Sequence, residues 1–309
     1  MIIKSKFIIC ILIVLILSGF ILNNRLPDGR YQRFDVRIFR NTPAWELAKA
    51  VNSQNTRRIA QISERNPELL MFEDPHHGLT LLIWAVGTEK YRSARALLEV
   101  GACPNILPSS GATALFHAAS FSFVDRSANR DPRFVTLLLE YGADPNIGFA
   151  GNPHSNNNTI EIGETPLMRS IGAGIEKTKA LVEAGADINF RTESGMNAAI
   201  WALLNGGPNR TLDMLEYSHY LIVEKKADVT GSYHPFFGGV ISDDVRYPVY
   251  ILRNWIYPIG SPEHKLKMEI VEEFARQGVD YWATEINAHQ FNSIQRLYPD
   301  TWEEFILLY

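Results

Sequence analysis

The residue types that most often do chemistry in proteins, histidine and cysteine, are scattered along this chain of 309 residues. A metal site needs such ligands at short, regular spacing, as in cysteines or histidines a few residues apart. Glycine-rich phosphate loops, Gly-x-Ser-x-Gly turns and Cys–His pairs do not occur in the sequence. The sequence therefore predicts a non-catalytic protein without a metal or cofactor. The histidines without ligand spacing are His76, His77, His117, His154, His219, His234, His264 and His289.

Acidic side chains recur along the repeating part of the chain: Glu140, Asp144, Asp187 and Asp228. Recurring acids could line a shared site. Each aspartate, however, follows a Gly-Ala or Lys-Ala pair. In such a turn a short acid accepts hydrogen bonds from nearby backbone N–H groups. We therefore interpret the aspartates as residues that close turns.

The elements that carry these turns repeat along the chain. The opening glycines Gly78 and Gly111 are 33 residues apart, and Gly163 and Gly195 are 32 apart. A period of this length is typical of repeat proteins, in which one unit cannot bury its own apolar face. Opening turns begin at Thr80, Thr113, Thr165 and Asn197, and closing turns cover 101–105, 142–146, 185–189, 226–229 and 278–280.

These motifs resemble the ankyrin repeat, which runs from G-x-T-P-L-H-x-A-A through a leucine pair to G-A-D-x-N. Residues 111–146 follow that order. The resemblance implies an all-α ankyrin-repeat solenoid of about five repeats plus caps, with helix pairs and β-hairpin-like fingers. Gly142 is then predicted to end a helix in the left-handed conformation, and Leu138 is predicted to face the core.

Four regions follow from this interpretation. Residues 1–24 form a membrane anchor or signal segment, 25–42 a linker, 43–283 the ankyrin-repeat domain and 284–309 a C-terminal capping segment. Apolar spacing over 43–65 indicates a degenerate first repeat. In the capping segment, four apolar side chains are predicted to cover the last repeat: Trp302, Phe305, Ile306 and Leu308.

Residues 7–22 carry no charge and follow Lys4 and Lys6. As a helix they reach about 24 Å, short of a ~30 Å hydrocarbon core, so they fit a short transmembrane anchor or a signal-peptide core. No Ala-x-Ala cleavage site follows, so we favour a single-pass inner-membrane anchor with the repeat domain in the periplasm. A cleaved periplasmic form is the alternative, and five arginines within 25–40 argue for the opposite orientation.

Charge and cysteine content restrict the partners. A net charge of −4 without a basic stripe argues against nucleic acid. Cys10 lies in the apolar leader and Cys103 in a repeat turn, so no disulfide is predicted. The expected partners are a protein and, through residues 7–22, a membrane.

The second and fourth repeats are longer than the others, with 31 residues from opening glycine to closing turn against 23 and 22 in the first and third. The extra residues fall between paired helices, around 125–132 and 206–212. The same repeats are followed by long fingers, 147–162 and 229–246. Long loops in a compact solenoid are often functional, although tolerated insertion gives the same pattern.

Ankyrin stacks resemble one another in binding proteins through finger tips and inner helix faces. Carried over by position, the predicted protein-binding residues are His76, His77, Leu79, Ser109, Ser110, Phe121, Glu161, Ile162, Glu164, Glu193, Met196, Asn205, Tyr233, Phe236 and Phe237. The three aromatic residues of 229–246 are predicted to anchor a partner, and 147–162 to supply rim contacts. An equal alternative is that the rings fold back on the stack.

The resemblance extends to bacterial ankyrin proteins that act as immunity proteins against secreted toxins, including lipase effectors. It implies an inhibitor tethered outside the cytoplasm. Two alternatives stay open. One is a periplasmic ankyrin scaffold that supports a stress-response enzyme, and the other is an enzyme or lipid-binding protein that uses residues 229–309.

Overall fold

The computed structural model describes residues 31–120, 124, 130–151, 160–207 and 213–309. The chain divides into two compact units, residues 1–110 and 111–309, and each is described by itself. The apolar segment 7–22 lies outside the described residues. Within the described ranges, none of the helices combines the length and apolar character needed to span a bilayer.

The first unit consists of stacked helix pairs. Its elements are η1 (Val36–Phe39), α2 (Trp45–Asn52), α3 (Thr56–Arg65), η2 (Pro67–Leu70), α4 (Leu81–Gly87) and α5 (Tyr91–Glu99). Helix α2 contacts α4, and α3 contacts α5, so equivalent helices of successive pairs pack together. Residues 43–65 therefore form a helix pair, as the apolar spacing predicted.

Residues 31–42, the described part of the predicted linker 25–42, pack on the first helix pair. Ile38 and Phe39 in η1 are buried, and η1 contacts α2. Asp35 caps η1 and accepts a 3.0 Å hydrogen bond from Arg37 Nε. A four-residue 3₁₀ turn is too short to produce a detectable period in the sequence.

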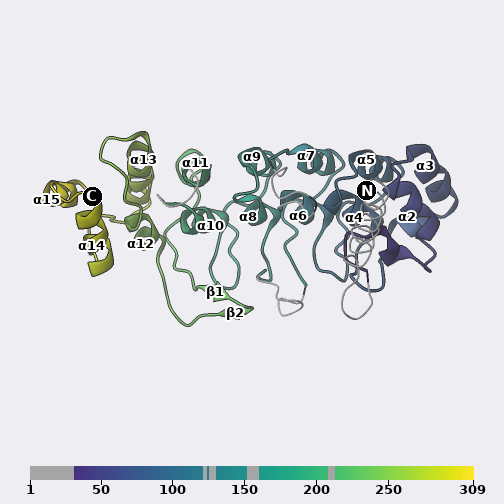
Figure 1. Cartoon of the computed structure of the whole chain (residues 1–309), viewed down its shortest axis with the longest axis horizontal. Helices are drawn as coiled ribbons and strands as arrows, with labels where there is room; N and C mark the ends of the chain where they lie inside the picture. The colour runs from purple at the N-terminus through teal and green to yellow at the C-terminus, as the bar shows by residue number, and fades with distance from the viewer. Residues whose placement is uncertain (1–30, 121–123, 125–129, 152–159, 208–212) are drawn as a thin grey trace, which may run out of the picture. The chain divides into compact units, whose positions relative to one another are not determined.

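The second unit contains two rows of helices. Figure 1 shows α6, α8, α10 and α12 in one row and α7, α9, α11 and α13 in the other, with the fingers on the side of the first row. Contacts between consecutive members of each row support this arrangement. The helices are α6 (Ala114–Ala119), α7 (Arg133–Glu140), α8 (Pro166–Ser170), α9 (Ile175–Glu183), α10 (Ala198–Asn205), α11 (Asp213–His219), the π-helical η4 (Tyr220–Glu224), α12 (Pro248–Arg253), α13 (Pro262–Arg276), α14 (Ala288–Leu297) and α15 (Trp302–Leu308).

The opening and closing turns form the local structure that their residue types predict. Each opening Thr or Asn accepts a hydrogen bond from the backbone N–H three residues later, which caps the helix that follows. Gly142 ends α7 with a φ of 81°, a conformation that a Cβ atom disfavours. The prediction for Gly142 is confirmed.

Hydrogen bonds also join neighbouring closing turns. Asn146 donates to the carbonyl of Gly185 at 3.1 Å and accepts from the N–H of Asp187 at 2.7 Å. Asn189 accepts from the N–H of Asp228 at 2.8 Å. The aspartates bond within their own turns, as predicted, because each accepts from the N–H two residues later: Asp144, Asp187 and Asp228.

The C-terminal segment covers the last repeat through part of the predicted set. Phe305 is buried in a cluster with Ile256, Ile294 and Tyr309, and Trp302 and Ile306 pack against it. Leu308 is 54% exposed and does not take part, which corrects the prediction for that residue. Leu138 in α7 is fully buried, as predicted.

Candidate functional site

Exposed apolar side chains occur on the finger 229–246 and at the start of α12. We call this set the finger surface; its members are Phe237, Val240, Val245, Tyr247 and Tyr250. The two residues at the finger tip are the most exposed, Phe237 at 73% and Val240 at 64%. Groups of exposed apolar side chains often mark an interaction site.

The tip of the finger is a short antiparallel hairpin. Strand β1 (Phe236–Phe237) pairs with β2 (Val240–Ile241). Gly238 and Gly239 connect the strands with φ of 58° and 86°, so both glycines have the positive φ that a tight two-residue hairpin turn requires. The turn places Phe237 and Val240 opposite each other at the end of the finger.

The stem of the finger is fixed to the helix stack. Tyr233 and Arg246 pair across the stem through backbone hydrogen bonds of 2.8 and 2.9 Å. The Tyr233 ring packs in a buried cluster with Met196 and Ile200 of the preceding repeat. The N–H of His234 donates to the carbonyl of Ser194 at 2.7 Å. These contacts hold the finger in place before any partner binds, which lowers the entropy cost of binding.

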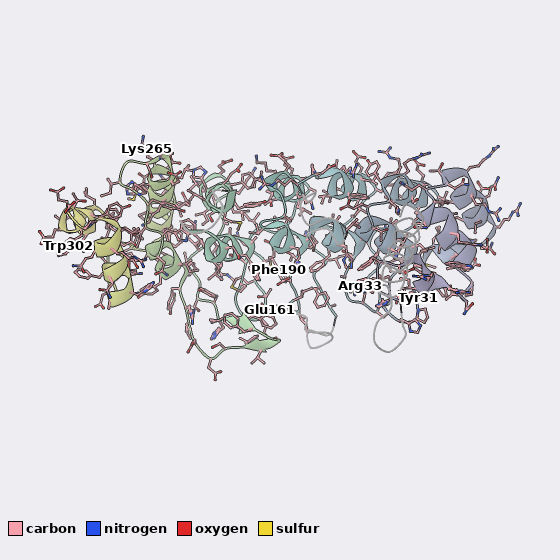
Figure 2. The ribbon with its side chains drawn as sticks, viewed as in Figure 1. Tyr31, Arg33, Glu161, Phe190, Lys265 and Trp302 are labelled. Atoms are coloured by element: carbon pink, nitrogen blue, oxygen red, sulfur yellow. The ribbon has the colours of Figure 1, made fainter. Side chains whose placement is uncertain are left out.

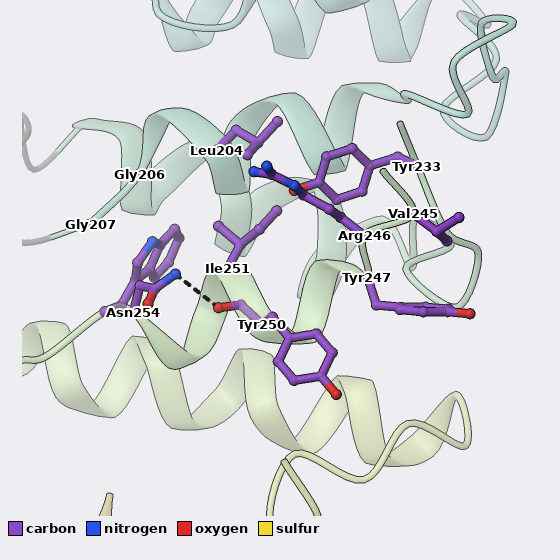
Figure 3. Close-up of a pocket in the computed structure, with 11 residues that line it drawn as sticks. Leu204, Gly206, Gly207, Tyr233, Val245, Arg246, Tyr247, Tyr250, Ile251 and Asn254 are labelled. Atoms are coloured by element: carbon purple, nitrogen blue, oxygen red, sulfur yellow. Dashed lines mark hydrogen bonds between the residues drawn. The ribbon is translucent and has the colours of Figure 1, made fainter. Parts of the chain in front are cut away.

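A pocket of about 540 Å³ opens between the finger, α10 and α12 (Figure 3). Four aromatic residues line it: Tyr233, Tyr247, Tyr250 and Trp255. Leu204, Val245 and Ile251 add aliphatic surface. This volume lies in the range of small-ligand and side-chain sites, and the lining combines these apolar groups with polar ones from Arg246 and Asn254.

The inner end of the pocket is built from glycine backbone against an indole ring. A Cβ atom on Gly206 would lie 2.1 Å from the Trp255 ring, and Gly207 has a φ of 113°. Asn254 donates to the carbonyl of Tyr250 at 3.0 Å and accepts from Gln290 at 2.9 Å. The contact with Trp255 explains why glycines follow α10. The hydrogen bonds of Asn254 orient the neighbouring pocket wall.

One carboxylate from the predicted binding set, that of Glu161, ties neighbouring fingers together instead. Glu161 is buried and accepts from the N–H of Ser194 at 2.8 Å, from its Oγ at 2.7 Å and from Thr192 at 2.9 Å. In the first unit, Glu73 accepts from the N–H and Oγ of Ser109 in the same way. Figure 2 shows Glu161 and Phe190 on the finger side of the second unit.

Glu164 is a second buried carboxyl in the same region, only 1% exposed. Burial raises its pKa to about 7, and the Arg169 guanidinium 3.4 Å away offsets this only in part. Its Oε1 has no hydrogen-bond partner among the described residues. Glu164 therefore changes charge near neutral pH inside the stack, where it does not face solvent.

The remaining predicted residues divide by exposure. Five side chains are buried and do not belong to the exposed surface: Leu79, Glu161, Glu164, Met196 and Tyr233. Five are exposed: His76, Ser109, Ile162, Glu193 and Phe237. Four are partly exposed: His77, Ser110, Asn205 and Phe236. Phe121 lies outside the described residues, as do residues 152–159 of the finger 147–162 that was predicted to supply rim contacts.

Burial of Tyr233 corrects the expectation of three rings near solvent. The alternative prediction, that the rings fold back on the helix stack, is correct for Tyr233. Sequence reasoning missed Val240, Val245, Tyr247 and Tyr250. Tyr247 and Tyr250 could have been recognised in the sequence as two aromatic residues that flank Pro248, the residue that begins α12. Across the described ranges, no cluster of three or more His, Cys, Asp or Glu side chains could hold a metal ion.

Comparison with known proteins found no matching protein-family profile. The chain is 28% identical over 142 residues to the inactive serine/threonine-protein kinase TEX14 of Bos taurus, which covers 46% of this chain and 8% of that protein. It is 33% identical over 151 residues to Protein PhlB of Serratia liquefaciens, which covers 48% of this chain and 57% of that protein. The chain thus spans less than two thirds of either relative.

Among solved structures, the ankyrin repeat protein EF0377 matches with a TM-score of 0.49 and 19% identity, over 75% of this chain and 96% of that chain. Independently of that match, the helix pairs, the Thr-capped opening turns and the glycine-terminated closing turns are those of ankyrin repeats. Ankyrin repeats generally act as protein-interaction scaffolds. The chain has an ankyrin-repeat fold.

Proposed function

We propose that this chain is a non-catalytic ankyrin module whose protein partner docks on the finger surface. The observation that carries the proposal is the contrast between a fixed finger stem and an exposed apolar tip. Phe237 and Val240 lie on a hairpin whose base is held by Tyr233. Covering exposed apolar surface contributes about 25 cal/mol per Å², so a partner that covers this tip gains binding free energy.

The partner that we propose is a secreted toxin or effector, such as a lipase, which makes the chain an immunity protein. The apolar segment 7–22 behind Lys4 and Lys6 supports a single-pass anchor with the repeats in the periplasm. A tether would hold the inhibitor where a toxin arrives. A scaffold for a stress-response enzyme would use the same surface, so the identity of the partner separates the two functions.

The proposal is tested by affinity capture from membranes with two matched double variants. Phe237→Ala with Val240→Ala truncates the finger tip, whereas Leu307→Ala with Leu308→Ala truncates exposed residues of α15. Circular dichroism should show both variants folded. We expect the wild type and the α15 variant to retain one discrete partner, and the finger variant to lose most of it, because truncating an interface anchor costs about 2 kcal/mol or more.

Equal retention by both variants would place the interface elsewhere and refute the proposal. A retained toxin supports the immunity function, and a retained stress-response enzyme supports the scaffold. The periplasmic location is tested separately by fusing reporters after residue 309. Signal only from a reporter that works in the cytoplasm would contradict the proposed orientation.

A further inference from the structure

The pocket beside the finger surface has a chemistry that selects among partner segments. Its walls are aromatic and aliphatic, with Tyr247 and Tyr250 at the solvent side and Trp255 buried behind them. In Figure 3 the Arg246 side chain lies beside the Tyr233 ring, and the Tyr247 and Tyr250 rings lie below them. A flat apolar side chain that enters the pocket would contact aromatic rings of this lining.

The charge of the pocket is one-sided. Among the lining residues that the structure describes, Arg246 is the single one with a formal charge. Its guanidinium lies close enough to the Tyr233 phenol to act on the pKa of that group, against the larger effect of burial, which raises it. An acidic partner group would therefore meet a cation at the pocket mouth, and a basic group would meet the same cation unfavourably.

The nearest carboxylate forms only a weak ion pair with the Arg246 guanidinium. Asp244 lies 3.6 Å from the guanidinium, but both side chains are more than half exposed. Exposed ion pairs of this kind contribute little and are exchanged readily for a better partner. A carboxylate that arrives with an aromatic group would form its ion pair next to apolar walls, where the interaction with a guanidinium is stronger.

We infer that the pocket binds a segment of the partner protein in which an aromatic side chain is followed by a carboxylate. The ring occupies the space between Tyr250, Ile251 and Trp255, and the carboxylate pairs with Arg246. This inference rests on the proposed function, because it assumes that the finger surface is the docking site. It adds a chemical requirement that the finger tip alone does not impose.

Two short probes separate the ring requirement from the charge requirement. N-acetyl-Trp-Asp-amide and N-acetyl-Trp-Lys-amide have the same ring and opposite charges. Binding to the intact protein is measured by ligand-detected NMR up to about 10 mM, since single-residue anchors bind weakly. We expect the Asp peptide to bind at least about fivefold more tightly than the Lys peptide.

Variants assign the binding to the pocket. Arg246→Gln should remove the preference for the Asp peptide, because it weakens binding of that peptide and relieves the repulsion that the Lys peptide meets. Tyr250→Ala should weaken both peptides about tenfold. Tyr141→Ala, at the end of α7 and outside the pocket, is the matched control for removal of a partly exposed tyrosine and should change neither.

Several outcomes would overturn the inference: no binding of either peptide, equal binding of both, or full binding to Tyr250→Ala. Failure of the proposed function is recognised differently. If the finger-tip variant still captures the partner, the docking site is wrong. If the finger-tip variant loses the partner while neither peptide binds, the docking site holds and the pocket chemistry is wrong.

Discussion

Glu164→Gln is expected to stabilise the protein above neutral pH and to change how its stability depends on pH. The Glu164 carboxyl is 1% exposed, one of its oxygens has no partner among the described residues, and burial raises its pKa to about 7. In the unfolded chain the same group titrates at about 4.5. Gln is similar in size and shape and carries no charge.

The sign and the size of this pH dependence follow from proton linkage. Between pH 4.5 and 7 the folded chain keeps a proton on Glu164 that the unfolded chain has released. The free energy of unfolding of the wild type therefore falls as the pH rises through this window. A difference of about 2.5 pKa units corresponds to about 3 kcal/mol, which is fully lost above pH 7.

The assay is urea denaturation of the wild type, Glu164→Gln and Glu193→Gln at several pH values from 4.5 to 8. Glu193 is an exposed carboxyl of the next finger and serves as the control. From pH 4.5 to 8, the free energy of unfolding of Glu164→Gln should rise by about 3 kcal/mol relative to that of the wild type. A difference that is independent of pH would refute the raised pKa, and the same shift in the control would refute its assignment to Glu164.

Two further predictions concern stability. Leu138→Ala should lower the free energy of unfolding by about 2–5 kcal/mol because it empties a fully buried site in α7; a loss below about 0.5 kcal/mol in urea denaturation would contradict that burial. Burial, together with the Arg253 guanidinium, lowers the pKa of Lys267 well below its ordinary value. The unfolded chain therefore binds a proton that the folded chain lacks, and wild-type stability should rise with pH from the lowered pKa toward about 10.5. Lys267→Met should abolish that rise and, at pH 7, stabilise by about 1 kcal/mol; an unchanged pH dependence would contradict the assignment.

The sequence predicted the repeats well because their signals are local. Thr80, Thr113 and Thr165 each cap the helix that they begin, and Gly142 ends α7, through bonds that span only a few residues. The helix pairs and the register of Leu138 follow from these turns. Residues 31–42 escaped detection because their packing depends on two buried side chains in a single short turn.

The binding residues were harder to predict because their exposure depends on contacts between distant segments. Glu161 is buried because its carboxylate meets Ser194, 33 residues away, and Tyr233 is buried because its ring reaches Met196 and Ile200. Position within an ankyrin unit does not specify such contacts. The pocket needs three segments together, so Trp255 and Gly206 could not be recognised as neighbours from the sequence.

Site-specific photo-crosslinking in living cells tests the central claim, that the finger surface is the docking site, most directly. A photoreactive phenylalanine analogue is placed at position 237 on the finger tip or at position 265 on α13, which Figure 2 places on the side opposite the fingers. We predict a discrete crosslinked protein from position 237 that Arg246→Gln weakens, and none from position 265. A crosslink from position 265 with none from position 237 would contradict this account.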